Sequence, residues 1–417
     1  MTRSEKTLIF SVTVGNILEW YEFTLFAFLS PILSSHYFHN ETPAKALLYT
    51  FMIYAAGFLS RPIGGLFFGY LGDRYGRKFA LLFSVIAMTV PTFCIGLIPT
   101  TTNLGLTAPL LLLILRLLQG LITGGELAGI MCFLNEGVPL HRRTFISSWS
   151  FIGVQLGGIF SLIECLFLSR TLTFDAFIAW GWRISFVIGG IVGLIGLFLR
   201  YRLKETPLFH QLEKNHKLIR TPILETFSRY KKHLLSAFLI TGLPLSANFL
   251  LFSFSSIYFK KVLFLPFESS IIYTGLLILL STIFLPIFGK LGSIFPRKRL
   301  LLIATLGLIL IAYPLLLAVR HNTFVFPLAI LCILFLTCYL ALLPSTLVEL
   351  FPTTIRYTSL GFSYNCAATI LGGTTPLIAL TLLNTTQNIT APSLIVIVTG
   401  LLSLFALLTA ENKSIFH

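Results

Sequence analysis

The chain alternates between long apolar segments and short polar loops. Most of the apolar segments have about 20 residues or more, the length that an α-helix needs to cross the hydrocarbon core of a bilayer. The pattern therefore predicts an all-α membrane protein with twelve transmembrane helices. These predicted helices cover residues 8–34, 46–70, 79–99, 108–133, 144–168, 181–200, 233–259, 269–290, 300–319, 325–348, 357–383 and 391–410.

One long polar segment, residues 201–232, follows the sixth predicted helix. It divides the chain into an N-terminal six-helix bundle (residues 1–200) and a C-terminal six-helix bundle (residues 233–417). Lys and Arg are dense in this segment, which is typical of a cytoplasmic linker whose amphipathic pieces face lipid head groups.

Composition supports a membrane protein. Charged residues make up 11% of the chain, less than half of the share of about 25% in soluble domains. The net charge of +15 would suggest nucleic-acid binding in a soluble protein, but here Lys and Arg gather in alternate loops. The positive-inside rule explains this arrangement. It predicts a multi-pass protein of the inner (plasma) membrane with both termini in the cytoplasm and no nucleic-acid partner.

The six cysteines all lie in apolar segments, and no Cys-x-x-Cys occurs. We therefore expect buried thiols, without a disulfide or a metal site. No Ser/His/Asp constellation and no phosphate-binding Gly-x-x-x-x-Gly-Lys motif is found, so the sequence does not indicate an enzyme or an ATP-driven pump.

Two motifs recur at corresponding loops of the two halves. GYLGDRYGRK at 69–78 matches GKLGSIFPRK at 289–298, and Glu-x-x-Pro-x-x-x-Arg occurs at 136–143 and again at 349–356. Parallel repeats of this kind are typical of transporters, in which the substrate site lies between the halves near mid-membrane.

The repeated loop at 69–78 and the stretch Arg116–Gly120 resemble signature motifs of the major facilitator superfamily. The stretch GNILEWYEF at 15–23 is similar to helix 1 of its metabolite:proton symporter family, which includes proline/betaine, 2-oxoglutarate, shikimate and citrate carriers. Residues 92–99, TFCIGLIP, look most like the proline/betaine carriers. The resemblance implies the major facilitator fold, a monomer, and transport driven by the proton gradient without a cofactor. Further stretches that carry the resemblance are 61–65, 124–126, 180–183 and 351–357.

The sequence departs from that family at three places. The usual Asp after Trp-Tyr on helix 1 is Glu22, the usual Arg-Ile-Pro is RIS at 183–185, and Glu164 stands where an apolar residue is expected.

Ionisable residues inside the predicted helices all belong to the N-terminal half. Each costs about 2.5–3.5 kcal/mol at the bilayer centre, so intramembrane charge indicates function. We therefore expect proton coupling in this half. The four acids and two bases also favour a zwitterionic substrate over a di-anion. The residues are Glu19, Glu22, Arg61, Arg116, Glu126 and Glu164.

Glu19 and Glu22 are three residues apart and share a helix face, where two ionised carboxylates repel. Proton-coupled sugar carriers place an acid of helix 1 against an arginine of helix 4, so the resemblance implies that Glu22 faces Arg116, with Glu19 as the alternative. A static polar network that holds helix 1 is the other interpretation. Glu126 belongs either to the proton path or to a clamp with a helix-2 residue such as Arg61.

Glu164, near the outer end of helix 5, is interpreted either as a snorkelling surface acid or as a contact for substrate or proton. Other charges lie at the cytoplasmic ends of the helices, where we expect ion pairs that act as a gate between access states. The gate candidates are Asp73, Arg74, Arg77, Glu136, Arg143, Glu349 and Arg356.

Polar and aromatic side chains inside the helices are candidates for contact with the substrate, and an aromatic face could hold an organic cation. These candidates are Trp20, Tyr21, Gln119, Gln155, Asn248, Tyr364 and Asn365. The sequence thus predicts a proton-coupled symporter that imports a small organic zwitterion or acid by alternating access. The alternative is an exporter or exchanger of metabolites or drugs with the same fold.

Overall fold

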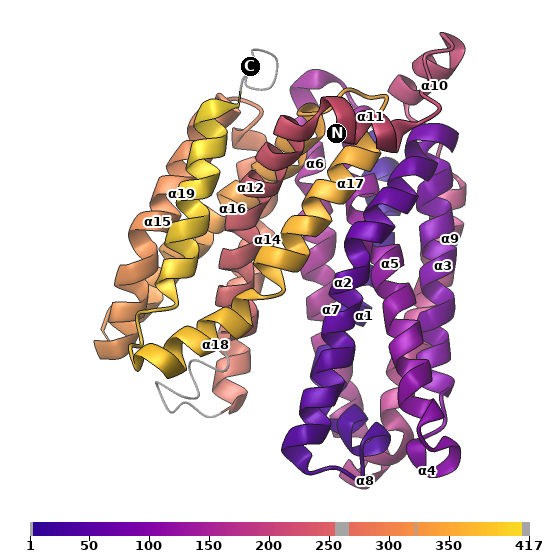
Figure 1. Cartoon of the computed structure of the whole chain (residues 1–417), viewed down its shortest axis with the longest axis vertical. Coiled ribbons are helices and arrows are strands. Elements are labelled where there is room, and N and C mark those ends of the chain that lie inside the picture. The colour runs from indigo at the N-terminus through magenta and orange to yellow at the C-terminus, as the bar shows by residue number, and fades with distance from the viewer. Residues whose placement is uncertain (1–2, 255–266, 322, 411–417) are drawn as a thin grey trace. The chain divides into compact units, whose positions relative to one another are not determined.

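The computed structural model describes residues 3–254, 267–321 and 323–410. Every regular element of this part of the chain is a helix (Figure 1). Within a bilayer, a helix satisfies its own backbone hydrogen bonds, which explains why long apolar segments adopt this structure. The all-α fold class predicted from the sequence is confirmed.

The first half of the chain forms six long helices and several short ones. The long helices are α1 (Arg3–Tyr37), α2 (Pro43–Tyr75), α3 (Arg77–Leu97), α5 (Thr107–Glu136), α7 (Trp149–Thr171) and α9 (Trp182–Tyr201). The short ones are α4 (Thr101–Leu104), η1 (Leu140–Arg142), α6 (Arg143–Ser147), α8 (Phe174–Ala176) and η2 (Phe177–Gly181).

The second half repeats this pattern after two short helices of the linker, α10 (Pro207–Lys214) and α11 (Pro222–Arg229). Its elements are α12 (Lys231–Asn248), η3 (Phe249–Phe254), α14 (Phe267–Leu291), α15 (Arg297–His321), α16 (Val325–Glu349), α17 (Arg356–Ala367), η4 (Ala368–Gly372), α18 (Thr375–Thr386) and α19 (Ser393–Thr409).

Nine helical segments of the described residues are long and apolar enough to cross a membrane. Together with α1, α14 and α19 they correspond to the twelve predicted helices. The end of the predicted helix 233–259 lies outside the described residues. Two predicted helices are interrupted: α6 gives way to α7 at Ser148, and the π turn η4 separates α17 from α18.

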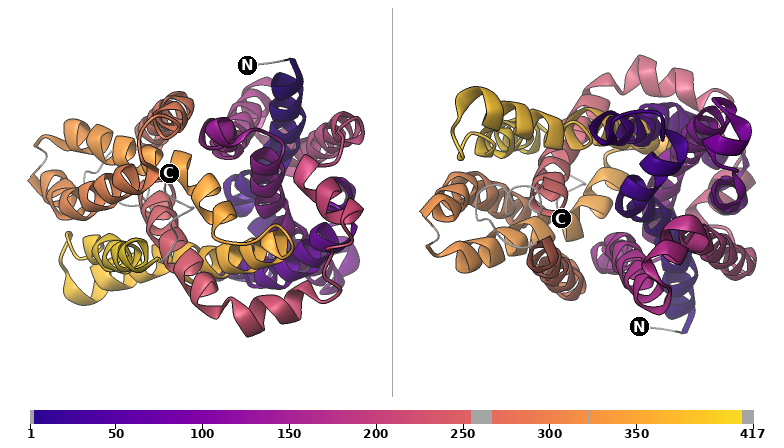
Figure 2. Two further views of the ribbon diagram at one scale, coloured as in Figure 1. Left: turned by 90° about the horizontal axis from the view of Figure 1, so that it is seen from above. Right: turned by 90° about the horizontal axis from the view of Figure 1, so that it is seen from below.

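The chain forms two compact units that exchange a short segment. Unit 1 consists of Met1–Gly137, Ile152–Ile223 and Thr353–Phe362, and unit 2 consists of Val138–Phe151, Leu224–Pro352 and Ser363–His417. The loop with the first Glu-x-x-Pro-x-x-x-Arg motif therefore belongs partly to unit 2, and the loop with the second belongs partly to unit 1. Figure 2 shows the helices of unit 1 end-on, as a bundle.

Glycines make room for the exchanged segments at equivalent positions of the repeat. In unit 1, a side chain at Gly72 would collide with the ring of Tyr357, at the start of α17. In unit 2, a side chain at Gly292 would meet Thr144, in α6. Small residues let helices approach closely, so the glycines shared by 69–78 and 289–298 are explained by packing.

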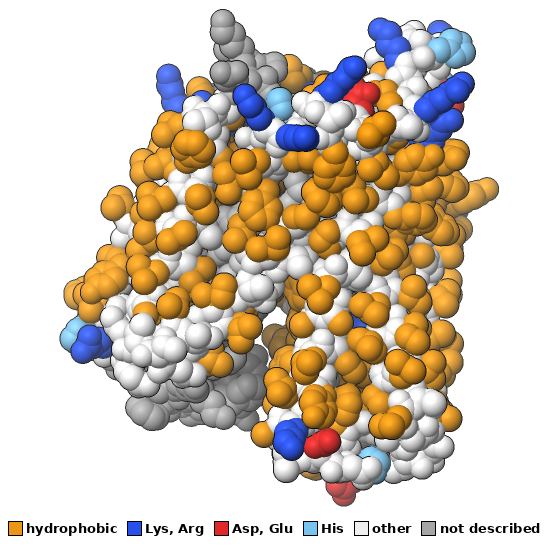
Figure 3. Space-filling model, in the orientation of Figure 1, with side chains coloured by type: hydrophobic (Ala, Val, Ile, Leu, Met, Phe, Trp, Pro, Cys, Tyr) orange, Lys and Arg blue, Asp and Glu red, His pale blue; other side chains and the backbone are white. Residues whose placement is uncertain are grey.

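The surface of unit 1 fits a membrane environment. Hydrophobic side chains cover the visible faces of its long helices, and Lys and Arg gather near α10 (Figure 3). Below this surface, small residues again permit close packing: a side chain at Gly124 of α5 would collide with the backbone of Arg61 in α2. This contact fixes the position of two helices that carry buried charges.

Candidate functional site

Glu22 and Arg116 meet in the interior of unit 1. Glu22 Oε1 of α1 lies 3.6 Å from Arg116 Nη1 of α5, and neither side chain is more than 2% exposed. The Thr92 hydroxyl of α3 donates to Glu22 Oε2. Arg116 Nη1 also donates to Gln119 Oε1 at 2.8 Å. Three helices thus position one buried ion pair.

Aromatic rings surround the Arg116 guanidinium. Its central carbon lies 4.2 Å from the ring centre of Phe26, 5.2 Å from Tyr54 and 5.4 Å from Phe23. Cation–π attraction of this kind stabilises a desolvated guanidinium. Arg116 Nε and Nη2 are buried and bond to no acceptor in the described part of the chain. The arginine therefore has hydrogen-bonding capacity that Glu22 and Gln119 do not use.

A second buried ion pair joins Glu126 of α5 to Arg200 of α9. Arg200 also donates to Val12 O at 3.3 Å and to Leu81 O at 3.1 Å, and Ser84 donates to Glu126. Arg200, the last residue of the predicted helix 181–200, is only 1% exposed.

Gly15 explains how Arg200 reaches this position. A side chain at Gly15 would overlap the guanidinium. The glycine of the GNILEWYEF stretch therefore makes room for Arg200, which comes from the end of α9. The sequence contains this signal, but nothing in it relates Gly15 to Arg200.

Glu19 and Arg61 are buried between the two ion pairs. Both side chains are 3% exposed. The Arg61 guanidinium stacks on Phe58 at 4.3 Å and on Phe23 at 4.6 Å, and lies 5.9 Å from the Trp20 ring centre. Glu19 Oε2 receives no hydrogen bond from any described residue.

Glu164 is not a snorkelling surface acid, because it is only 7% exposed. Its Oε1 accepts a hydrogen bond from Ser185 at 2.8 Å, and its Oε2 lies 3.4 Å from the Tyr21 hydroxyl. Tyr21 donates to Ser185 O at 2.7 Å. These bonds connect α1, α7 and α9, which indicates a structural role for Glu164.

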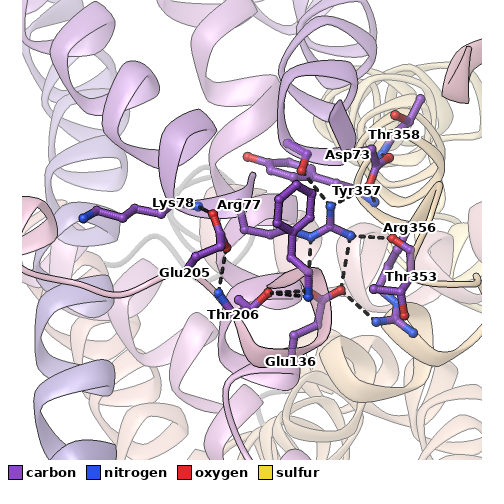
Figure 4. A network of polar contacts seen from close by, with 12 residues as sticks. Asp73, Arg77, Lys78, Glu136, Glu205, Thr206, Thr353, Arg356, Tyr357 and Thr358 are labelled. Atoms are coloured by element: carbon purple, nitrogen blue, oxygen red, sulfur yellow. Dashed lines mark hydrogen bonds and ion pairs between the residues drawn. The ribbon is translucent and has the colours of Figure 1, made fainter. Parts of the chain in front are cut away.

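A network of polar contacts lies at the end of α5, in unit 1 (Figure 4). Glu136 is its centre: it accepts from Arg77 Nε at 3.1 Å, from Arg356 Nη1 at 2.7 Å and from the Thr206 hydroxyl at 2.9 Å. Arg77 Nη2 donates to Thr353 O at 2.5 Å. Glu136 and Arg77 are fully buried side chains. One carboxylate therefore connects α3 to residues of the linker and to the exchanged segment at 353–362.

Asp73 holds the start of α17 in the same network. Its two carboxylate oxygens accept from the backbone N–H groups of Tyr357 at 3.1 Å and Thr358 at 2.8 Å, and Arg77 Nη1 lies 3.1 Å from Oδ1. Unsatisfied N–H groups give a helix N-terminus partial positive charge, which a carboxylate stabilises. Asp73 is thus the cap of α17, although they lie far apart in the sequence.

The linker contributes two residues that sequence analysis missed. Glu205 accepts from the backbone N–H of Lys78 at 3.0 Å, at the start of α3, and Thr206 donates to Glu136. Phe209 of α10 lies under the Arg77 guanidinium, 5.1 Å from it, and is 3% exposed. The linker is therefore partly docked on unit 1 and is not only a solvated loop.

The gate candidates are divided between the units. In unit 2, Glu349 forms an ion pair with Arg297 Nη2 at 2.5 Å. This pair is the repeat counterpart of Glu136 and Arg77. Arg356, from the second Glu-x-x-Pro-x-x-x-Arg motif, binds Glu136 of the first. Arg74 and Arg143 are half-buried.

The substrate candidates are also divided. Tyr21 and Gln119 belong to the buried networks of unit 1 described above, and Trp20 and Gln155 belong to the same unit. Asn248, Tyr364 and Asn365 belong to unit 2, where the last two are 3% exposed. Among the described residues, no three His, Cys, Asp or Glu side chains form a group that could hold a metal ion.

A multi-pass helical protein with duplicated halves and buried ion pairs has the construction of a membrane transporter. The family model "Sugar (and other) transporter" matches residues 8–226. The proline/betaine transporter of Escherichia coli strain K12 is 31% identical over 421 residues, which cover 97% of this chain and 83% of that protein. The glycine betaine/proline/ectoine/pipecolic acid transporter OusA of Dickeya dadantii is 31% identical over 420 residues, with the same coverage.

Among solved structures, the proton:xylose symporter XylE bound to 6-bromo-6-deoxy-D-glucose matches with a TM-score of 0.75 at 17% identity, over 97% of this chain and 94% of that one. The chain belongs to the sugar (and other) transporter family of the major facilitator superfamily. It is a multi-pass transporter of the inner membrane and not an enzyme, and its predicted fold is confirmed.

Proposed function

We propose that this transporter is a proton-coupled symporter that imports a small organic zwitterion or acid of the proline and betaine type by alternating access, with both termini in the cytoplasm. The observation that carries this proposal is the buried pair of Glu22 and Arg116, in which Arg116 keeps unused donors. The printed names of the relatives in Escherichia coli and Dickeya dadantii support this substrate class.

The coupling follows from the charges of the pair. While Glu22 is ionised, Arg116 is neutralised by it. When Glu22 binds a proton, the buried guanidinium loses its counter-ion, and an uncompensated buried charge is costly. A substrate carboxylate then restores the charge balance by accepting from Arg116. Proton and carboxylate therefore bind together, which is the requirement for symport.

Aromatic rings hold the two buried arginines of this region. Phe23, Tyr54 and Phe58 pack against one another, with Phe23 4.6 Å from Tyr54 and 4.9 Å from Phe58. Ring faces of this kind attract cations, and here they lie against the guanidinium groups of Arg61 and Arg116. The Glu136 and Asp73 networks act as the gate, because opening the cytoplasmic side would have to break them.

The test uses purified protein in proteoliposomes, with uptake of L-proline, glycine betaine, 2-oxoglutarate, citrate and xylose. An alkaline interior should drive accumulation of proline or betaine above equilibrium. Glu22→Gln should abolish this uphill uptake and keep exchange of labelled for unlabelled substrate. Glu225→Gln, in the surface helix α11, is the matched control and should behave as the wild type.

Full gradient-driven uptake by both Glu22→Gln and Glu19→Gln would refute the coupling assignment. Accumulation of xylose, without proline or betaine, would refute the substrate class.

A further inference from the structure

A cavity lies between Glu19 and Glu126 in unit 1. Its walls come from α1, α3 and α5 and include Gly15, Thr123 and both glutamates. The space open to the centre of a water molecule is about 10 Å³, which is the size needed to hold one water. Two buried acids therefore face one water-sized space.

The two acids differ in their surroundings. Glu126 is compensated by Arg200 and accepts a hydrogen bond from Ser84. Glu19 Oε2 has no donor in the described chain and is buried. A buried carboxylate oxygen without a hydrogen-bond donor is costly when the group is ionised, and protonation lowers this cost. The geometry therefore favours a protonated Glu19 next to an ionised Glu126.

The charged groups around Glu19 favour a single proton shared between Glu19 and Glu126. Arg61 of α2 and Arg200 of α9 are the cations that act on it, and Glu126 of α5 and Glu22 of α1 are the anions. Of the two cations, Arg200 is bonded to Glu126. Like charges at one site cannot both stay ionised without cost, so a single proton between Glu19 and Glu126 relieves their repulsion.

A second cavity of the same size lies beside Arg116. It is lined by Arg61, Arg116 and Gln119, and it shares Met88 and Thr123 with the first cavity. Gln119 Nε2 lies 3.4 Å from the hydroxyl of Thr92, which donates to Glu22. Thr123 is therefore the polar side chain common to both cavities.

We propose that Glu19 and Glu126, positioned by Arg200, form a second proton-binding site, and that the Thr123 hydroxyl connects it through one water on each side to the Glu22–Arg116 site. The hydroxyl accepts a proton from the water in one cavity and gives its own proton to the water in the other. No charge stays on Thr123. A proton that enters from the Glu22–Arg116 site binds Glu19 when Glu19 is ionised, and Glu19 is then the protonated member of the pair. The proposal rests on the proposed symport and adds the route by which the proton leaves the substrate site.

The test removes the hydroxyl and keeps the shape. In proteoliposomes, Thr123→Val should lower the ratio of proton-driven uptake of L-proline or glycine betaine to exchange of the same substrate at least tenfold. Thr123→Ser should restore the ratio. Thr241→Val is the matched control: Thr241 of α12 is also buried, and its hydroxyl donates to Ala237 O at 2.7 Å, within its own helix.

A second measurement reads the proton directly. Infrared difference spectra of the wild type, recorded on raising the pH, should show loss of a protonated carboxylic acid, and this signal should be missing in Glu19→Gln. The signal does not depend on transport. The measurement compares the wild type with Glu19→Gln. It therefore remains informative even if Glu126→Gln, in which Arg200 loses its counter-ion, fails to fold.

The outcomes separate the two proposals. If the wild type takes up no protons with any substrate of the panel, the proposed symport is refuted and the second site with it. If the wild type couples and Thr123→Val couples equally well, or if Glu19→Gln keeps the infrared signal, only the second site is refuted. Dependence of the uptake ratio on a sodium gradient would also overturn it, because the cavity would then hold a metal cation.

Discussion

Replacing Glu136 by Gln tests whether the network at the end of α5 is a gate. Glu136 is a fully buried carboxylate that compensates Arg77 and Arg356. The amide keeps the shape of the side chain but removes its charge, so Arg356 loses this counter-ion and Arg77 keeps Asp73. Breaking a buried ion pair from one side costs about 3–5 kcal/mol. At 1.4 kcal/mol for each factor of ten, the equilibrium between closed and open states should shift by roughly two to three and a half powers of ten.

A native thiol reports the opening. Cys132 lies one helical turn before Glu136 on α5 and is fully buried, with Glu136, Arg77 and Arg356 among its charged neighbours. Its rate of labelling by a maleimide should follow the population of the open state when opening and closing are fast. The background for this assay has the other cysteines replaced, namely Cys94, Cys165, Cys332, Cys338 and Cys366.

We expect Glu136→Gln to accelerate labelling of Cys132 at least about tenfold; the increase stops growing once the gate is mostly open. Glu349→Gln, which breaks the pair with Arg297 in unit 2, is the matched control and should change this rate much less. Equal labelling of Cys132 in Glu136→Gln and the wild type, with both folded, would refute the gate assignment.

Three further predictions concern single contacts. Asp73→Asn should lower the transport rate about tenfold, because the amide is a weaker cap for α17; initial rates of proline uptake measure this. Burial raises the pKa of Glu205 above the usual range of glutamate, so its ionised form disfavours docking of the linker. Docking of the linker should therefore be tightest in acid and weaken as pH rises through that raised pKa. Hydrogen exchange of α10 between pH 5 and pH 8 should show this weakening. Glu205→Gln should remove the pH dependence of docking. Gly15→Ala should lower the unfolding temperature by displacing Arg200, while Gly158→Ala, whose new methyl group would have only ordinary contacts, should leave it unchanged.

The helices could be predicted from the sequence because each depends on a local property. A segment of about 20 apolar residues has no other stable form in a bilayer, so α3, α15 and α16 match their predicted ranges to within a few residues. Glu22 and Arg116 could also be chosen from the sequence, because charge inside an apolar helix is costly and therefore conspicuous.

Arg200 could not be identified in this way. It stands at the end of an apolar segment beside Arg202 and Lys204, where the positive-inside rule already explains a basic residue. Its burial depends on Gly15, on Val12 O and on Glu126, which belong to other helices. The contact of Arg356 with Glu136 is similarly long-range. The sequence shows that the motif is repeated, but it does not show that the arginine of the second copy binds the glutamate of the first.

The two copies of the repeated loop differ at the residue that caps an exchanged segment in unit 1. In unit 1, Asp73 caps α17 and Glu136 binds two arginines. In unit 2, the residue equivalent to Asp73 is Ser293, whose hydroxyl bonds to the backbone of its own helix at Gly289 O, 3.3 Å away. A serine cannot supply the anion that a helix N-terminus prefers. The packing of the exchanged segments is therefore repeated in both units, whereas the carboxylate cap that Asp73 provides is not repeated at Ser293. If transport requires these segments to be released in turn, the release of residues 353–362 has to break the contacts of Asp73 and Glu136, and substitutions of Asp73 should slow or unlock transport more than substitutions of Ser293.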